Sequence, residues 1–292
     1  MPTKEKMDVY SVVTDAILEA MERDGLPPWR KAWNGANAGM PTNAVSKKAY
    51  RGINILLLMG HDYTDNRWVS FKQAQELGGS VRKGEKSTII TFWKITKEER
   101  ENDNGEMVTK TFPLLRYYRV FNVEQCDGLK LKAVTVVEHD PIPEAEAVIA
   151  GMPNPPSIDH KGGDKAFYSP MLDSISLPAK CSFAKVEEYY STKFHEMGHS
   201  TGHESRCNRK GICQISHFGD DNYSQEELVA EFCAAFLCAE TGIIPATLEN
   251  SAAYIKSWRN VLKADKKMVV FAASQGQKAA DYILDRKPEY TS

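Results

Sequence analysis

The chain has 292 residues, of which 42% are hydrophobic and 26% are charged, and its formal net charge at pH 7 is -2. This length accommodates two ordinary domains, each with a core of its own, and the composition is typical of a globular protein. The small net charge excludes a protein that binds nucleic acid through a bulk positive field. Residues 1–130 contain 20 Lys and Arg against 17 Asp and Glu, so any contact with nucleic acid would have to come from local patches.

The sequence carries no signal for a membrane or for secretion. Its apolar run in residues 53–60 is far too short to span a bilayer. The first six residues lack the apolar region of a signal peptide, and the six cysteines form no C-x-x-C pair. We therefore expect a cytoplasmic protein with reduced thiols and no membrane partner.

Apolar side chains recur at helical spacing in three N-terminal segments, which end near glycine or proline. The predicted helices are residues 7–23, 50–58 and 72–79. Two later segments are rich in β-branched and aromatic residues, which favour strands. The predicted strands are residues 87–95 and 113–121, joined by a charged hairpin loop at residues 97–106.

Aromatic and basic residues are interleaved throughout this N-terminal part. Flat rings can stack any base and cations can hold the phosphates, which suits binding of a single strand without sequence preference. The alternative is ordinary structure: indoles that anchor a loop to the core and charges on a solvated turn. The residues that we assign to nucleic-acid binding are Trp29, Arg30, Lys31, Trp33, Arg51, Trp68, Lys72, Arg82, Lys83, Lys86, Trp93, Arg116, Tyr118 and Arg119.

Residues 195–199 read His-Glu-Met-Gly-His, the H-E-x-x-H pattern of metallopeptidases, although this short pattern also occurs by chance. Histidines four apart lie on one face of a helix, so His195 and His199 can bind one cation. We expect zinc, with manganese or another divalent ion as alternatives. Glu196 faces the open side of such a metal, where it can take a proton from water and pass it to a leaving amine.

Two helices are predicted to carry this site. The first has Ser182 as its N-cap and ends at Gly202. The second covers residues 224–240, with Ser224 as its N-cap and Glu227 at the capping-box position.

The second helix supplies carboxylates to the metal. We assign Glu227 as the third ligand and Glu231 as the group that orients a ligand histidine. Glu226 and Glu231 remain alternative ligands, and a solvated first turn is the ordinary explanation of both Glu226 and Glu227. His203 lies beside the site without being a ligand.

Further elements surround the predicted site. We assign Tyr223 to stabilise the oxyanion of a tetrahedral intermediate, with His203 and His217 as alternatives. Residues 164–170 and 173–178 predict two short strands, one of which would align an extended peptide by backbone pairing. Terminal helices are predicted in residues 252–267 and 278–285.

These motifs carry a resemblance. Residues 195–203, followed by the helix with Glu226, Glu227 and Glu231, resemble the C-terminal zincin-like metallopeptidase domain of ArdC-type antirestriction proteins. The N-terminal segments that are similar to the single-stranded-DNA-binding domain of that family are residues 50–54, 68–79, 81–86 and 120–125. One departure from better-known zincins is Ser205, which stands where metzincins have a third histidine and so favours a glutamate ligand.

The predicted fold class is α+β in two domains. Residues 1–131 are expected to form a mixed α/β domain with a small antiparallel sheet that binds single-stranded DNA. A linker follows at 132–143, and residues 144–292 are expected to form a mainly helical zincin-like metallopeptidase domain with a short edge-strand sheet.

The resemblance implies antirestriction, the protection of incoming plasmid DNA during conjugation. Its expected partners are single-stranded DNA and a host restriction or DNA-processing protein as substrate. A second hypothesis stays open: an accessory protein that binds single-stranded DNA and whose metal site is structural or inactive. Glu196 favours catalysis, because a structural site has no use for an acid beside its ligands.

Overall fold

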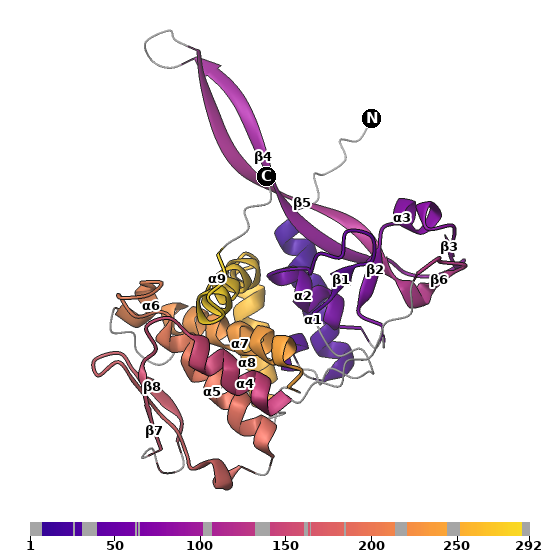
Figure 1. The fold of residues 1–292 in the computed structure, drawn as a ribbon. Helices are drawn as coiled ribbons and strands as arrows, with labels where there is room; N and C mark the ends of the chain where they lie inside the picture. The colour runs from indigo at the N-terminus through magenta and orange to yellow at the C-terminus, as the bar shows by residue number, and fades with distance from the viewer. Residues whose placement is uncertain are drawn as a thin grey trace.

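The computed structural model describes residues 8–25, 27–30, 40–61, 63, 65–101, 107–131, 141–160, 163, 165–183, 185–213, 221–243 and 252–287. Its class is α+β, with a long two-stranded arm in the N-terminal half and packed helices in the C-terminal half (Figure 1). The predicted fold class is therefore confirmed. Within the described residues, no helix has the length and hydropathy needed to cross a bilayer.

The N-terminal half contributes α1 (Val9–Asp24), η1 (Pro28–Arg30), β1 (Thr42–Asn43), α2 (Ile53–Met59), β2 (Arg67–Val69), α3 (Phe71–Glu76), β3 (Ser80–Val81), β4 (Thr88–Glu101), β5 (Met107–Asn122), η2 (Val123–Gln125) and β6 (Cys126–Asp127). The C-terminal half contributes α4 (Pro141–Gly151), β7 (Ser157–Asp159), β8 (Phe167–Ser169), β9 (Ser174–Ser176), η3 (Lys180–Ser182), α5 (Val186–Ser200), α6 (Lys210–Cys213), α7 (Asp221–Thr241), α8 (Ala252–Ala264) and α9 (Met268–Ile283).

The larger sheet has the strand order β1-β2-β5-β4, and its last two strands extend into an arm that leaves the body of the molecule (Figure 1). These antiparallel strands pair without a break from Thr88 opposite Val120 to Glu101 opposite Met107. At the base of the arm, Asn54 of α2 bonds both backbone groups of Thr91, which covers the outer edge of β4. The strands are longer than predicted, and they occupy part of the segment that we expected to be a loop.

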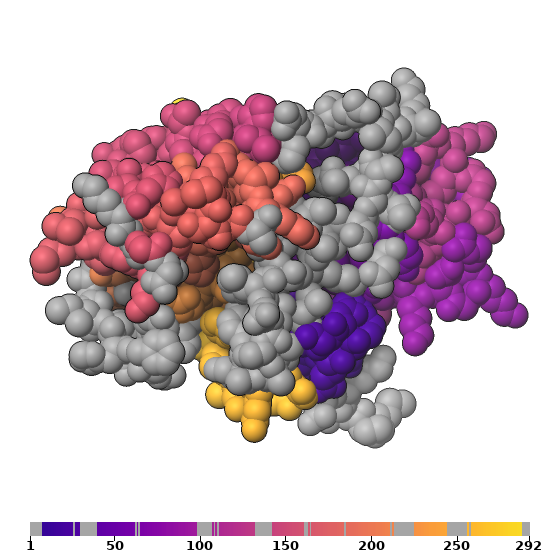
Figure 2. Space-filling model, turned by 90° about the horizontal axis from the view of Figure 1, so that it is seen from below, coloured from indigo at the N-terminus to yellow at the C-terminus, as the bar shows by residue number. Residues whose placement is uncertain are grey.

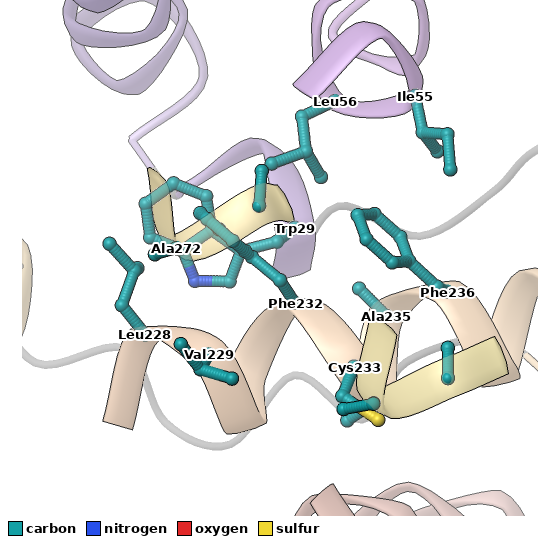
Figure 3. Close-up of a cluster of buried hydrophobic side chains, with 14 of the residues drawn as sticks. Trp29, Ile55, Leu56, Leu228, Val229, Phe232, Cys233, Ala235, Phe236 and Ala272 are labelled. Atoms are coloured by element: carbon teal, nitrogen blue, oxygen red, sulfur yellow. The ribbon is translucent and has the colours of Figure 1, made fainter. Parts of the chain in front are cut away.

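One hydrophobic core joins the two halves of the sequence. Trp29 is 1% exposed, and its ring makes edge contacts with the rings of Phe232, at 5.0 Å between centroids, and Trp258, at 6.3 Å. Figure 3 shows Trp29 and Leu56 facing α7. The expectation of a core for each domain did not include this shared core, in which the N-terminal helices complete the core of the C-terminal ones. Two smaller clusters, around Trp68 and around Val69, lie within the N-terminal half. Most of the predicted linker, residues 132–143, lies outside the described residues, and its last three residues begin α4.

Polar contacts reinforce this shared core. Thr14 of α1 donates from its hydroxyl to the carbonyl of Lys266, at 2.8 Å, and the backbone N–H of Gly52 donates to Gln277 of α9, at 3.0 Å. Figure 2 shows α1, in indigo, beside the yellow C-terminal helices. The N-terminal segments are thus attached to the helices that carry the candidate site.

Two glycines let α5, α7 and α9 approach closely. A Cβ at Gly198 would lie 3.1 Å from the Cα of Ala230, and a Cβ at Gly276 would lie 2.8 Å from the Cβ of Phe232. Both separations are shorter than normal side-chain contacts, so the missing Cβ atoms set the distance between the helices. Gly198 lies inside the H-E-x-x-H motif, and it therefore brings the motif close to α7.

Both predicted N-caps of the site helices are wrong. Ser182 lies in η3, and α5 begins at Val186 after an extended Lys185, because an irregular turn intervenes. Helix α7 begins at Asp221, so Ser224 lies within its first turn and cannot cap it.

Candidate metal centre and nucleic-acid surface

Helices α5 and α7 bring three metal-ligating side chains together. His195, His199 and Glu227 offer ligand atoms that all lie within 4.8 Å of one another. The two Nε2 atoms are 3.1 Å apart, and Glu227 lies 3.6 Å from His195 Nε2 and 3.4 Å from His199 Nε2. The three residues predicted as ligands are therefore adjacent in space.

These separations fit a divalent metal ion. Zinc bonds of about 2.0–2.2 Å at tetrahedral angles place two ligand atoms about 3.3–3.5 Å apart. The separation of 3.1 Å between the two Nε2 atoms, and those of 3.6 Å from His195 Nε2 to Glu227 Oε2 and 3.4 Å from His199 Nε2 to Glu227 Oε1, bracket this range. Two imidazoles and one carboxylate leave a fourth position, as catalytic zinc sites do.

A buried pair behind His199 was not predicted in this role. Glu226 lies 3.5 Å from the Nδ1 of His199, a buried ring atom that sits just beyond ordinary hydrogen-bond distance. Arg209 holds the same carboxylate by two hydrogen bonds, one of them at 2.9 Å, and its guanidinium also donates to Thr201 and to the carbonyl of Gly198. Arg209 thereby connects α5, α7 and the segment between them.

The electrostatics favour a positive charge at this site. Burial lowers the pKa of His199, but the contacts with Glu226 and Glu227 outweigh it and raise the pKa to about 10. Burial also raises the pKa of Glu227, yet hydrogen bonds and charges from His195 and His199 hold it well below its ordinary value. The site can therefore stabilise positive charge, whether as a proton on His199 or as a divalent cation.

Glu196 follows the candidate ligand His195 on α5. It is buried at 7% exposure, and its charge contributes to the raised pKa of His199. A carboxylate that is buried next to a ligand histidine can exchange protons with a water molecule at the fourth position. The arrangement supports a general base at Glu196.

Other predicted site residues are less closely tied to the ligands. Glu226 lies 3.5 Å from the Nδ1 atom of His199, the position that we expected of Glu231. Glu231 is also buried on α7, and its role stays a prediction. His203 bonds through Nδ1 with Ser205, at 2.8 Å, in the turn after α5. The side chain of Tyr223 lies outside the described residues, as does His217.

Several residues that we assigned to nucleic-acid binding are committed elsewhere. Trp29 and Trp68 are 1% and 2% exposed, so protein covers both rings and they cannot stack bases. The assignments of Trp29 and Trp68 are corrected, because both rings serve the core. Arg51 pairs with the buried Asp281 of α9. This ion pair attaches the start of α2 to the C-terminal helices. The side chain of Arg51 is 43% exposed, and its assignment stays a prediction.

Other basic candidates remain on the surface. Arg82 pairs with Glu85, at 2.8 Å, and Lys72 lies 3.6 Å from Glu76, so carboxylates partly neutralise both. The exposed candidates without such a pairing in the described contacts are Lys83, Lys86, Trp93, Arg116, Tyr118 and Arg119. Lys31, Trp33 and the side chain of Arg30 lie outside the described residues.

Known proteins share both halves of this architecture. Residues 143–275 match the zincin-like metallopeptidase family, and residues 7–121 match the N-terminal domain of anti-restriction factor ArdC. The metal-free crystal structure of antirestriction protein ArdC from the R388 plasmid is 34% identical, with a TM-score of 0.73, over 97% of this chain and 100% of that chain. The chain belongs to the ArdC family of antirestriction proteins.

Other relatives are consistent with this ArdC assignment. The Mn(II)-bound crystal structure of R388 ArdC is also 34% identical, with a TM-score of 0.71, over 98% of this chain and all of that one. Protein y4eC of Sinorhizobium fredii is 33% identical over 94% of this chain and 91% of its own length. Two DNA primases TraC of Escherichia coli are 36% identical over 96% of this chain, which spans only 20% and 27% of their lengths.

Proposed function

We propose that this member of the ArdC family combines a metal-dependent peptidase with a module that binds single-stranded DNA, and that it protects incoming plasmid DNA from host restriction during conjugation. The peptidase rests on one observation: His195, His199 and Glu227 converge at tetrahedral spacing beside the buried Glu196. The match to a zincin-like metallopeptidase supports the same reaction class.

Each residue has a separate task in peptide hydrolysis. His195, His199 and Glu227 would hold the metal ion, which when bound polarises a peptide carbonyl and lowers the pKa of water. Glu196 accepts the proton of the attacking water and donates it to the leaving amine. Glu226 and Arg209 hold His199 in the orientation that binding requires.

Substrate alignment falls to the small C-terminal sheet. Its strand order is β7-β9-β8, so β8 lies at an edge, and β8 also contacts α5. An extended peptide can pair with an edge strand through its backbone, which places a peptide bond over α5 without requiring a particular sequence. We therefore select β8 from the two predicted strands, with a host restriction or DNA-processing protein as the substrate.

Zinc is the proposed ion, because two imidazoles and one carboxylate form a common catalytic zinc site. Manganese is the alternative that the Mn(II)-bound relative supports. Single-stranded DNA is the proposed ligand of the N-terminal half, which matches the ArdC N-terminal domain and keeps exposed aromatic and basic side chains.

The test of the peptidase is Glu196→Gln in the full chain. We expect the variant to bind zinc or manganese as the wild type does and to lose at least about a hundredfold in the rate of cleavage of a denatured protein or a restriction enzyme. Glu187→Gln, in the first turn of the same helix, is the matched control and should leave cleavage unchanged.

Cleavage that survives Glu196→Gln would remove Glu196 from the mechanism. If the wild type, loaded with either metal, cleaves none of these proteins, and Glu196→Gln still protects DNA in the cell, the accessory-protein hypothesis replaces the peptidase. The DNA-binding half is tested by the salt dependence of binding to an oligothymidylate, since phosphate contacts weaken as salt rises.

A further inference from the structure

The arm has two chemically different faces. Directly paired residues of antiparallel strands point to the same side, and successive residues point to opposite sides. The pairing joins Ile90 to Tyr118 and Phe92 to Arg116, so residues with even numbers share one face throughout the arm. We call this the even face. Its members between 88 and 120 whose side chains the structure describes are Thr88, Ile90, Phe92, Lys94, Thr96, Phe112, Leu114, Arg116, Tyr118 and Val120, and the pairs of Glu98 with Lys110 and of Arg100 with Val108 continue it toward the tip of the arm.

Three aromatic rings of the even face are exposed to solvent. Phe92 is 43% exposed, Tyr118 42% and Phe112 37%. Phe92 and Tyr118 meet edge to face, with ring centroids 5.7 Å apart. Phe112 is paired with Thr96, which lies four residues from Phe92 along β4, so about 13 Å separates it from the first two rings.

The even face is also cationic. Arg116 lies directly opposite Phe92, and Lys94 is the next even residue along β4, between the two groups of rings. Both cations are exposed, and none of the ten described side chains of this face is acidic. Nearer the tip, Glu98 shares the face and is paired with Lys110. A polyanion therefore meets cations and no carboxylate along the part of the face that carries the three rings.

The opposite face has a different composition. Its exposed large apolar side chains are Trp93, Ile95 and Met107, and its Leu115 is buried in the shared core. An aliphatic side chain offers no ring for a base to stack on, so this face presents one exposed indole where the even face presents three rings.

We propose that the even face of the arm is the platform on which single-stranded DNA stacks, an inference that rests on the proposed DNA-binding function and gives it a location. Phe92, Phe112 and Tyr118 receive bases, while Lys94 and Arg116 contact phosphates. Exposure of these rings to water is unfavourable in the free protein, and the rings make favourable contacts once bases cover them. The cations between the rings bind the phosphates and so keep the backbone of the DNA strand on the same face.

The experiment measures binding of the full chain to a fluorescent oligothymidylate of about 20 nucleotides at several salt concentrations. Phe92→Ala and Tyr118→Ala should each weaken the dissociation constant by about tenfold, because stacking on one ring contributes that much. Arg116→Gln should also reduce the slope of log affinity against log salt by about 0.7, the contribution of one phosphate contact to a single strand.

Matched controls come from the opposite face of the same strand. Ile95→Ala removes an exposed apolar side chain, and Lys97→Gln removes an exposed cation. Both should leave the affinity within about twofold of the wild type. Thermal melting of every variant separates a lost contact from a lost fold.

The outcomes distinguish this inference from the function on which it rests. A wild type without salt-dependent affinity removes the DNA-binding function itself. If the wild type binds but the even-face variants bind equally well, or the controls weaken binding as much, the platform is elsewhere and the function stands. An even-face variant that changes the elution volume in size-exclusion chromatography, with DNA affinity intact, would show that a second copy covers the face.

Discussion

The metal centre between α5 and α7 and the arm formed by β4 and β5 place charged and apolar side chains in opposite environments. At the metal centre the ionisable groups Glu196, Arg209 and Glu226 are buried, and Arg209 and Glu226 satisfy each other. On the arm, Phe92 and Trp93 expose nearly half of their surface.

This difference predicts how each region responds to substitution. Removing one partner of a buried ion pair lowers the free energy of unfolding by far more than the pair contributes, because the other charge stays buried and unpaired. The metal centre should therefore respond strongly to substitutions that change only a few atoms. Rings on an open strand contact few neighbours, so the arm should tolerate substitution without losing stability. Binding and folding are therefore coupled at the metal centre and separable on the arm.

The largest effect is expected behind the metal centre, at Trp29. Trp29→Ala should lower the free energy of unfolding by roughly 4 kcal/mol, because it removes a fully buried ring from the contact with Phe232 of α7. Chemical denaturation of the full chain measures this change. Trp29→Phe keeps a ring at the position and should cost less than half as much. A cost below about 1 kcal/mol for Trp29→Ala would mean that the N-terminal half does not share the core.

The next effect concerns the buried carboxylate behind His199. Glu226→Gln should weaken metal binding by about 10- to 100-fold, as losses of groups that orient ligand histidines do. The physical reason is that a neutral amide holds the Nδ1 proton of His199 less strongly and no longer neutralises Arg209. Competition with a chelating dye measures the affinity for zinc and for manganese.

Glu240→Gln is the control on the same helix, since Glu240 pairs with Arg286 away from the ligands. It should leave metal affinity unchanged. Melting of the metal-free proteins tests whether Glu226→Gln acts only through the fold. If adding Arg209→Gln restores the melting temperature and also restores wild-type affinity, Glu226 does not orient His199.

The sequence predicts the two histidines of the candidate ligand set from their spacing alone, but it does not predict which carboxylate joins them. Residues four apart on a helix share a face, so His195 and His199 had to lie together. Glu226 and Glu227 could not be ranked with certainty by spacing, since adjacent residues point in different directions and the rotation of α7 against α5 depends on packing at Gly198. Arg209, in an irregular segment, carries no periodic signal that links it to Glu226.

The sequence predicts an element well where the residue types of its own segment determine it. It predicts poorly where the N-terminal and C-terminal halves pack against each other. The strands of the arm followed from their β-branched and aromatic residues. Trp29 and Trp68 were assigned to DNA because a tryptophan next to cations has the same local sequence whether it stacks on a base or packs edge-on against a ring such as Phe232. Only long-range packing, which no local window contains, decides between the two.

The ion pair between Asp173 and Arg206 is intermediate in burial between the metal centre and the arm. Asp173, partly exposed, forms two hydrogen bonds of 2.8 Å with the buried Arg206, which holds the turn before β9 against the end of α5. Contact with Arg206 lowers the pKa of Asp173 below its ordinary value. A carboxyl whose folded pKa is depressed stabilises the fold above its unfolded pKa, and this contribution is lost as the pH falls through the folded pKa.

Asp173→Asn should therefore lower the free energy of unfolding by roughly 1.5 kcal/mol at pH 7, and the difference from wild type should shrink as the pH falls below about 4. Denaturation at a series of pH values measures it. Asp15→Asn breaks an exposed pair with Lys266 and should change stability by less than about 0.5 kcal/mol at every pH. A difference for Asp173→Asn that persists unchanged at low pH would mean that the ion pair is not its source.

The smallest effect is expected at Trp93, the exposed counterpart of the buried Trp29. Trp93→Thr keeps a residue that favours strands and removes an indole that is 49% exposed, so the free energy of unfolding should change by less than about 0.5 kcal/mol. The same denaturation experiment used for Trp29 applies, which makes the two tryptophans a direct measure of the contrast between core and arm. A loss of 2 kcal/mol or more, by contrast, would show that the arm folds back onto the body in solution, and its rings would then be core residues rather than a binding surface.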